Sequence, residues 1–301
     1  MNRKGCPMKN NRIFVIMVII LLMTTGCTRN AEDTPGSARP THTDSAGANA
    51  TGDVPSKTKK QDWIVVGTID HDTSSFTQGF EFIDADVIAE STGLYGQSSI
   101  QLISASNGAI LQKKMLPETL FAEGLTVVDG KVIQLTWRNR TLISWSANSQ
   151  HGIEPLAVHN DAYPGEGWGM CYDKTRNLIW RSDGTANLIS HDPSTFTQRD
   201  KTPVTMDKQP LSELNELECI DGKVWANVWQ SNTIVIIDPN TGVVESQLDL
   251  NEIVMDAQKA NGRPFDTNQV LNGIARNPAN GYIYVTGKQW PKTYIIKTKG
   301  V

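Results

Sequence analysis

The 301-residue sequence lacks the patterns that mark several common classes of active site. It has five histidines, and no two of them stand at the spacing of a zinc site. It contains neither a Gly-rich phosphate loop between a strand and a helix nor the Gly-x-Ser-x-Gly elbow of a serine hydrolase. These absences argue against zinc, nucleotide and serine-hydrolase chemistry built on those motifs.

Charge of one sign and long apolar runs are also scarce. The net charge is −4 and no Lys/Arg-rich run occurs, so we expect no nucleic-acid partner. The apolar run Ile13–Met23 has eleven residues, which is short for a transmembrane helix. A hydrophobic content of 39% with 20% charged residues is typical of a globular protein with a sizeable core.

The N-terminus has the order of features of a secretory signal. Basic residues precede the apolar run, and small residues follow it up to Gly26-Cys27. This ending resembles a bacterial lipobox, although Thr24 stands where that motif usually has Leu. We therefore predict a signal peptide over 1–27 with lipidation of Cys27. A plain signal peptide and an uncleaved anchor are the alternatives.

Residues 28–60 are rich in small and polar residues and in Pro, without apolar periodicity. Such a segment cannot bury enough surface to offset the entropy of ordering it, so it is predicted to be a disordered tether. The lipid would attach the protein to the membrane. We expect it at the bacterial cell envelope, on the periplasmic face of the outer membrane, or on the outer face of the plasma membrane where no outer membrane exists.

The rest of the chain consists of five repeat units. In two of them Asp129-Gly130-Lys131 and Asp221-Gly222-Lys223 match at a shift of 92 residues. Each unit opens with a polar residue, here called a repeat-start residue, followed by Gly or another small step. The repeat-start residues, at steps of 45, 43, 49 and 57, are Gln78, Glu123, Glu166, Asn215 and Asn272.

The units predict an all-β fold. Most contain four short β-like segments separated by turns, but the last lacks one, and Trp63–Ile69 is spare before the first. We therefore predict a five-bladed β-propeller over 61–301, made of four-stranded blades, in which this N-terminal strand closes the last blade. Only Leu250–Asn268 is expected to include a helix, which would explain the long last step.

Two cysteines, Cys171 and Cys219, lie in the repeats, four or five residues after a repeat start. An exported pair can form a disulfide. However, these positions fall on the first strands of consecutive units, which we expect to be too far apart for disulfide geometry. The sequence favours two buried free thiols over a disulfide.

In a propeller the first strand of each blade lines the central channel, so the repeat-start residues should meet at one mouth. A second set, fourteen to seventeen residues later, should lie beside them: Thr92, Trp137, Ser182 or Asp183, Trp229 and Lys288. Any one of these residues could be purely structural. The residue type changes from unit to unit, however, which indicates a ring that faces a ligand.

At these positions the sequence resembles the glutamine cyclotransferase family, the plant-type glutaminyl cyclases that also occur in bacteria. The resemblance runs from about Trp63 to the C-terminus and agrees with the five-bladed propeller of that family. Its motifs are Phe76-Thr-Gln-Gly-Phe80, Phe121-Ala-Glu-Gly-Leu-Thr126, Leu135-Thr-Trp137, Gly165-Glu-Gly-Trp-Gly169, Leu214-Asn-Glu-Leu-Glu218, Trp225-Ala-Asn-Val-Trp229, Leu271-Asn-Gly-Ile-Ala275 and Thr286-Gly-Lys288.

The resemblance implies an acyltransferase that converts the N-terminal glutamine of peptides or proteins into pyroglutamate and releases ammonia. It implies that catalysis needs no cofactor, and it allows a structural calcium ion whose ligands we do not assign. We also expect the protein to be a monomer. The implied catalytic residues are Glu123, Asn215, Lys288 and Gln78. The implied substrate-binding residues are Phe76, Trp137, Trp168 and Trp229.

The reaction suits these residue types. Asn215 and Lys288 can donate hydrogen bonds to the developing oxyanion, and Glu123 can carry a proton from the amine to the departing nitrogen. Tryptophan walls would raise the pKa of Glu123 and Lys288 would lower it, and the sequence leaves that balance open.

Two alternatives stay open. One is a calcium-dependent propeller hydrolase of lactones or esters, with oxygen ligands from Glu123, Glu166, Asn215 and Asn272. The other is a non-catalytic propeller that binds a peptide or glycan at the same ring.

Overall fold

The computed structural model describes residues 58–148 and 152–299, all within the unit Asp53–Val301. The predicted signal peptide, its lipidation site Cys27 and nearly all of the predicted tether lie outside the described residues. In the described ranges, no helix combines the length and apolar character needed to cross a bilayer. Short strands predominate, as predicted for an all-β chain.

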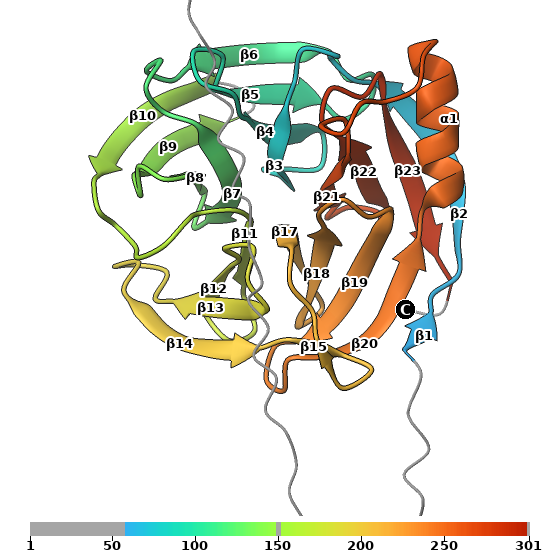
Figure 1. Cartoon of the computed structure of the whole chain (residues 1–301). Helices are drawn as coiled ribbons and strands as arrows, with labels where there is room; N and C mark the ends of the chain where they lie inside the picture. The colour runs from blue at the N-terminus through green and yellow to red at the C-terminus, as the bar shows by residue number, and fades with distance from the viewer. Residues whose placement is uncertain (1–57, 149–151, 300–301) are drawn as a thin grey trace, which may run out of the picture. The chain divides into compact units, whose positions relative to one another are not determined.

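Four of the sheets have four antiparallel strands each (Figure 1). The first contains β3 (Thr77–Phe82), β4 (Val87–Thr92), β5 (Ser99–Ser104) and β6 (Ile110–Met115). The second contains β7 (Ala122–Val128), β8 (Lys131–Thr136), β9 (Leu142–Asn148) and β10 (Gly152–His159). The third contains β11 (Met170–Asp173), β12 (Leu178–Arg181), β13 (Asn187–His191) and β14 (Gln198–Pro203). The fourth contains β2 (Trp63–Asp70), β21 (Leu271–Arg276), β22 (Ile283–Gly287) and β23 (Lys292–Thr298).

The remaining sheet has seven strands, so the prediction of a five-bladed propeller of four-stranded blades is wrong: the four-stranded blades number four. Its main strands are β17 (Leu214–Ile220), β18 (Lys223–Val228), β19 (Thr233–Asp238) and β20 (Val243–Asp249). Three short strands enlarge it: β1 (Lys59–Lys60), β15 (Thr205–Met206) and β16 (Gln209–Pro210). Both β1 and β15 pair in parallel with β20, which covers an edge that an ordinary blade leaves open.

The N-terminal strand completes the sheet of the last unit, as predicted. Strand β2 pairs antiparallel with β23, from Trp63 opposite Thr298 to Asp70 opposite Lys292. Helix α1 (Asn251–Asn261) lies inside the range predicted for it and ends earlier. Gly262, with a φ of 72°, provides the left-handed residue that terminates the helix.

One strand of each sheet lies innermost, and these five strands are β3, β7, β11, β17 and β21 (Figure 1). These strands contact one another in a closed sequence, β3 to β7, β7 to β11, β11 to β17, β17 to β21 and β21 to β3. Because they all run in the same sense through the ring, their starts meet at one mouth and their ends at the opposite mouth. The repeat-start residues stand at the starts, which is why distant parts of the chain can share one site.

Tight turns explain the repeated Asp-Gly-Lys pattern. Asp129-Gly130 joins β7 to β8, and Asp221-Gly222 joins β17 to β18. All four residues have positive φ, between 48° and 77°. Two-residue hairpins of this kind need Asp or Asn and then Gly, because other residues resist left-handed backbone. The repeat therefore marks equivalent hairpins.

Cys171 and Cys219 form a disulfide, so the interpretation as free thiols is wrong. They lie on β11 and β17, the adjacent innermost strands, and their Cα atoms are 5.4 Å apart. First strands of consecutive units converge at the centre of the ring, and this brings them within disulfide reach.

Candidate functional site

A pocket of about 270 Å³ opens at the mouth formed by the starts of the innermost strands. All eight residues predicted for catalysis or substrate binding line it: Phe76, Gln78, Glu123, Trp137, Trp168, Asn215, Trp229 and Lys288. Sequence reasoning missed three further lining residues, Leu94, Phe121 and Asn268. Phe121 sits two residues before Glu123, as Phe76 does before Gln78, so the repeat itself carried a signal for it.

The small residue after a repeat start allows neighbouring innermost strands to pack backbone to backbone. A Cβ at Gly124 would lie 2.5 Å from the carbonyl oxygen of Trp168, and one at Gly169 would overlap the carbonyl oxygen of Asn215. The amide of Gly124 also donates to that Trp168 carbonyl, at 2.6 Å. Glycine is therefore required where the strands must approach most closely.

Trp168, not Glu166, is the true repeat-start residue of the third unit. It stands two residues before Met170, which pairs with Arg181. Glu123 stands in the same way before Leu125, and Asn215 before Leu217. In the segment Gly165-Glu-Gly-Trp-Gly169 both Glu166 and Trp168 are followed by Gly, so the sequence alone does not show which of them begins the repeat. The structure corrects the position by two residues.

Glu166 instead bonds to the walls of the pocket. Its Oε2 accepts hydrogen bonds from the indole of Trp137 at 2.6 Å and from that of Trp168 at 3.0 Å. Its Oε1 accepts from Arg138 at 2.9 Å. Partial burial raises the pKa of Glu166, but these hydrogen bonds outweigh burial and lower it below its usual value.

Some residues of the second predicted set line the pocket and others do not. The backbone amides of Trp137, Trp229 and Lys288 donate to the first strand segments of their own sheets, which fixes these residues at the mouth. Thr92 and Ser182 are buried, and neither they nor Asp183 line the pocket. In those two units, therefore, the periodic position serves packing.

The polar centre of the pocket is a hydrogen-bonded series across three innermost strands. Asn272 donates to the backbone carbonyl of Thr77 at 2.9 Å and to Oε1 of Gln78 at 3.3 Å. Nε2 of Gln78 then donates to Oε1 of Glu123 at 3.0 Å. Asn272 does not line the pocket, but it orients the Gln78 amide so that its N–H faces Glu123.

Glu123 and Lys288 are both nearly fully buried and perturb each other. Burial raises the pKa of Glu123 well above its usual value, the charge of Lys288 opposes this, and Glu166 adds to it. Burial also lowers the pKa of Lys288 to about 8, against the charge of Glu123. Desolvation therefore wins for both groups, which answers the question that the sequence left open.

Asn215 has an unused acceptor in the same pocket. The residue is 3% exposed, and its Oδ1 has no hydrogen-bond partner within the described ranges. A buried acceptor without a donor is costly, so the pocket gains from a ligand that supplies an N–H.

Aromatic rings form the walls. Phe121 meets Phe76 at 6.2 Å and Trp137 at 5.6 Å between ring centroids, and Trp168 meets Trp229 edge-to-face at 5.9 Å. Nζ of Lys288 lies 4.8 Å from the centroid of Phe76, a cation–π contact that helps to hold the ammonium in a desolvated place.

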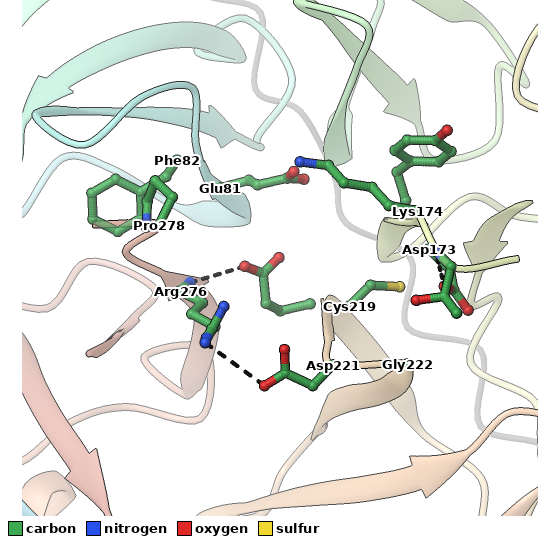
Figure 2. A pocket seen from close by; sticks show the side chains of 12 residues that line it. Glu81, Phe82, Asp173, Lys174, Cys219, Asp221, Gly222, Arg276 and Pro278 are labelled. Atoms are coloured by element: carbon green, nitrogen blue, oxygen red, sulfur yellow. Dashed lines mark hydrogen bonds and ion pairs between the residues drawn. The ribbon is translucent and has the colours of Figure 1, made fainter. Parts of the chain in front are cut away.

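A second pocket of about 270 Å³ lies where the innermost strands end, and its lining is charged (Figure 2). Glu81 and Lys174 point toward one another across it, and Arg276 pairs with Asp221 at 3.7 Å. The carboxylates also bind backbone amides of neighbouring strands. Glu81 accepts from Val127 at 3.2 Å, and Glu218 accepts from Arg276 at 2.9 Å. Sequence reasoning did not single out this cluster.

The four residues proposed for a calcium-dependent hydrolase are not presented as one ligand set. Glu123 and Asn215 line the pocket, whereas Glu166 and Asn272 do not, and both oxygens of Glu166 accept hydrogen bonds from two indoles and Arg138. Among the residues that the structure describes, no group of three His, Cys, Asp or Glu side chains could hold a metal ion. The donor set thus does not fit a calcium site.

Comparisons with known proteins identify the family of the chain. A sequence model of the glutamine cyclotransferase family matches residues 39–298. The glutaminyl-peptide cyclotransferase of Arabidopsis thaliana is 36% identical over 235 residues, covering 78% of this chain and 71% of the plant protein. The crystal structure of Myxococcus xanthus glutaminyl cyclase superposes with a TM-score of 0.72 at 31% identity, covering 81% of this chain and all of that one. The chain therefore belongs to the glutamine cyclotransferase family.

Proposed function

We propose that the aromatic pocket is the active site at which this chain cyclises N-terminal glutamine. The chain is a glutaminyl cyclase: it converts the N-terminal glutamine of peptides or proteins into pyroglutamate and releases ammonia. One observation carries the placement. The pocket joins a buried carboxylate of raised pKa, a buried ammonium of lowered pKa and an unpartnered amide oxygen inside aromatic walls.

The substrate enters with its glutamine side chain against the rings. The rings exclude water and restrict the flexible side chain, so that its amide carbon lies next to its own α-amine. Such positioning converts an improbable encounter into a probable one and accounts for much of the rate. The unpartnered Oδ1 of Asn215 is suited to accept an N–H of the substrate.

Glu123 moves the protons. An α-amine with a pKa of about 8 is mostly protonated at neutral pH, and the Glu123 carboxylate takes a proton so that the nitrogen can attack the side-chain amide carbon. The C–N bond of the ring forms and the carbonyl π electrons move to oxygen. Protonated Glu123 then gives its proton to the amide nitrogen, the C–N bond to that nitrogen breaks as the carbonyl bond re-forms, and ammonia leaves. The ring nitrogen still carries one extra proton, which passes to the Glu123 carboxylate and from there to solvent. Such acid–base help contributes about 10²–10⁴-fold.

Lys288 and the Nδ2 of Asn215 stabilise the oxyanion. Lys288 stays positively charged below its pKa of about 8 and lies in a dry pocket, where its charge acts most strongly. A preorganised donor of this type is worth about 3–4 kcal/mol. Gln78 holds Glu123 in place through the hydrogen bond that Asn272 orients.

The remaining features of the proposal concern its setting. Catalysis uses protein groups without a metal ion: Glu123 serves as the proton carrier, and both oxygens of Glu166 are bonded to the two indoles and Arg138. The protein acts as a monomer on exposed N-termini at the cell envelope, attached through Cys27. A substrate folded into a protein core would not reach the pocket.

The direct test is ammonia release from a peptide amide with N-terminal Gln, followed with and without EDTA. The same peptide with an N-acetyl group is the control, because acetylation removes the nucleophile. We expect release from the free peptide only, and unchanged by EDTA. Binding of the free peptide without any ammonia would support the binding propeller instead.

A further inference from the structure

The aromatic walls of the active site form two groups. The first is Phe76, Phe121 and Trp137, joined by the ring contacts given above and extended by Tyr95, which meets Phe121 at 5.4 Å. The second is Trp168 with Trp229. The two groups come from different sheets, and their spacing sets the width of the pocket.

A carboxylate joins the two groups. One oxygen of Glu166 accepts both indole N–H groups, at 2.6 Å from Trp137 and 3.0 Å from Trp168. The other oxygen binds Arg138, whose guanidinium stacks over the ring of Trp137 at 3.8 Å from the centroid. Hydrogen bonds to a charged acceptor are about twice as strong as neutral ones, so this link can fix both rings.

The backbone that carries Glu166 is itself held firmly. Arg181, which is fully buried, donates to the carbonyl oxygens of Glu166 and Pro164. A Cβ at Gly167 would lie 2.6 Å from the hydroxyl of Tyr163, so the loop fits closely against that ring. The position of Glu166 is thus determined by its neighbours and does not depend on bound substrate.

We propose that Glu166 is a positioning residue for the cyclisation, which holds Trp137 and Trp168 at the separation that folds the substrate glutamine onto its own amine. The proposal rests on the proposed function. Glu166 does not line the pocket and so acts through the two rings. Its negative charge also adds to the raised pKa of Glu123, which provides a second, independent readout.

Two substitutions separate the hydrogen bonds from the charge. Glu166→Leu removes both, whereas Glu166→Gln keeps a carbonyl oxygen that can accept from both indoles and loses only the charge. Asp161→Asn is the control, because it removes one negative charge from an exposed ion pair with Arg140 on the adjacent loop. The full chain is used, and kcat, KM and their pH dependence are measured together with tryptophan fluorescence and thermal unfolding.

We expect Glu166→Leu to lower kcat by about 10²-fold, with a smaller change in KM, because bound substrate is no longer oriented. Glu166→Gln should stay within about threefold of wild type in kcat. The acidic limb of its kcat–pH profile should move to lower pH, because loss of a nearby negative charge lowers the pKa of Glu123. Asp161→Asn should change neither kcat nor the position of the acidic limb. If Glu166→Leu does not fold, Trp137→Phe replaces it, since that variant keeps a ring and loses the N–H.

Retention of wild-type kcat in folded Glu166→Leu would overturn the proposal. An equal loss in Glu166→Gln and Glu166→Leu would also overturn it, since charge and not the shared acceptor would then matter. These failures are distinct from a failure of the proposed function, in which wild-type protein itself releases no ammonia.

Discussion

The two mouths of the ring hold pockets of equal volume, about 270 Å³ each, and both contain buried carboxylates of raised pKa. At one mouth Glu123 meets aromatic rings, a buried ammonium and an amide oxygen without a partner. At the opposite mouth burial raises the pKa of Glu81 to about 7, and that of Glu218 well above the usual value. A perturbed pKa therefore does not by itself tell the active mouth from the other one.

What differs is the use of the carboxylate oxygens. Glu81 and Glu218 accept hydrogen bonds from backbone amides of neighbouring innermost strands, so they join one sheet to the next. Glu123 accepts from the side chain of Gln78 and lies in a pocket lined by rings that a substrate can contact. The first arrangement fastens the ring, and the second leaves a proton carrier available to a ligand.

Glu123→Gln should have the largest effect of any single change. The variant keeps the size of the side chain but cannot take a proton, so turnover should fall by about 10²–10⁴-fold. Its melting temperature should be equal to or above that of wild type, because a buried carboxylate is replaced by a neutral amide. Ordinary ammonia release by this variant would place the chemistry elsewhere.

Lys288 should set the alkaline limb of the pH profile. Its charged form stabilises the oxyanion, and its pKa is lowered to about 8, so kcat should fall as the pH rises through that value. In Lys288→Arg the guanidinium stays charged, and the alkaline limb should disappear from the range up to pH 10 or so, at whatever kcat remains. The measurement is kcat at saturating peptide against pH. An alkaline limb near 8 in both proteins would assign it to another group.

The disulfide joins strands that serve both mouths and should matter mainly for stability. Cys171→Ala with Cys219→Ala opens a link between residues 48 apart in the sequence, and should cost about 2–4 kcal/mol in the free energy of unfolding. Urea denaturation measures this, and kcat at 25 °C should change by less than about threefold. A large fall in kcat without loss of stability would show that the link holds Trp168 and Asn215 in their active geometry.

The smallest effect is expected at the charged mouth. Because the folded protein holds a proton on Glu81 with a pKa of about 7, against an ordinary value near 4.5, that proton stabilises the fold at low pH. This contribution is lost as the pH rises toward and through 7. As the pH rises from 5 to 8, the free energy of unfolding of Glu81→Gln should therefore increase relative to that of wild type, by an amount on the order of 1 kcal/mol. Equal pH dependence of unfolding in the two proteins would contradict this.

The repeat made much of the fold predictable. The period, the Asp-Gly hairpins and the spare N-terminal strand follow from local rules for strands and turns, and β2 does complete the last sheet. The size of the seven-stranded sheet did not follow, because Lys59–Lys60 and Thr205–Met206 are too short to show a β pattern. The disulfide was missed because the distance between first strands depends on how tightly the ring closes.

The site was predictable where a residue contacts the pocket directly. All eight expected residues line it: the family motifs include every one of them, and periodicity independently located Gln78, Glu123 and Asn215 at the starts of innermost strands. Glu166 was placed on the ring by spacing alone, and only its contacts with two indoles reveal what it does. The carboxylates at the opposite mouth were not predicted as a cluster, although Glu218 lies within a family motif, because their partners are backbone amides that any residue supplies.

The most direct test of the difference between the two mouths is pyroglutamate formation from one N-terminal Gln peptide by wild type, Glu123→Gln and Glu81→Gln, measured side by side by mass spectrometry. Both substitutions remove one buried carboxylate of raised pKa and keep its shape. We expect Glu81→Gln to match wild type within about twofold and Glu123→Gln to lose at least about 10²-fold. Loss of activity in folded Glu81→Gln with retention in Glu123→Gln would contradict the assignment of the aromatic mouth as the active site.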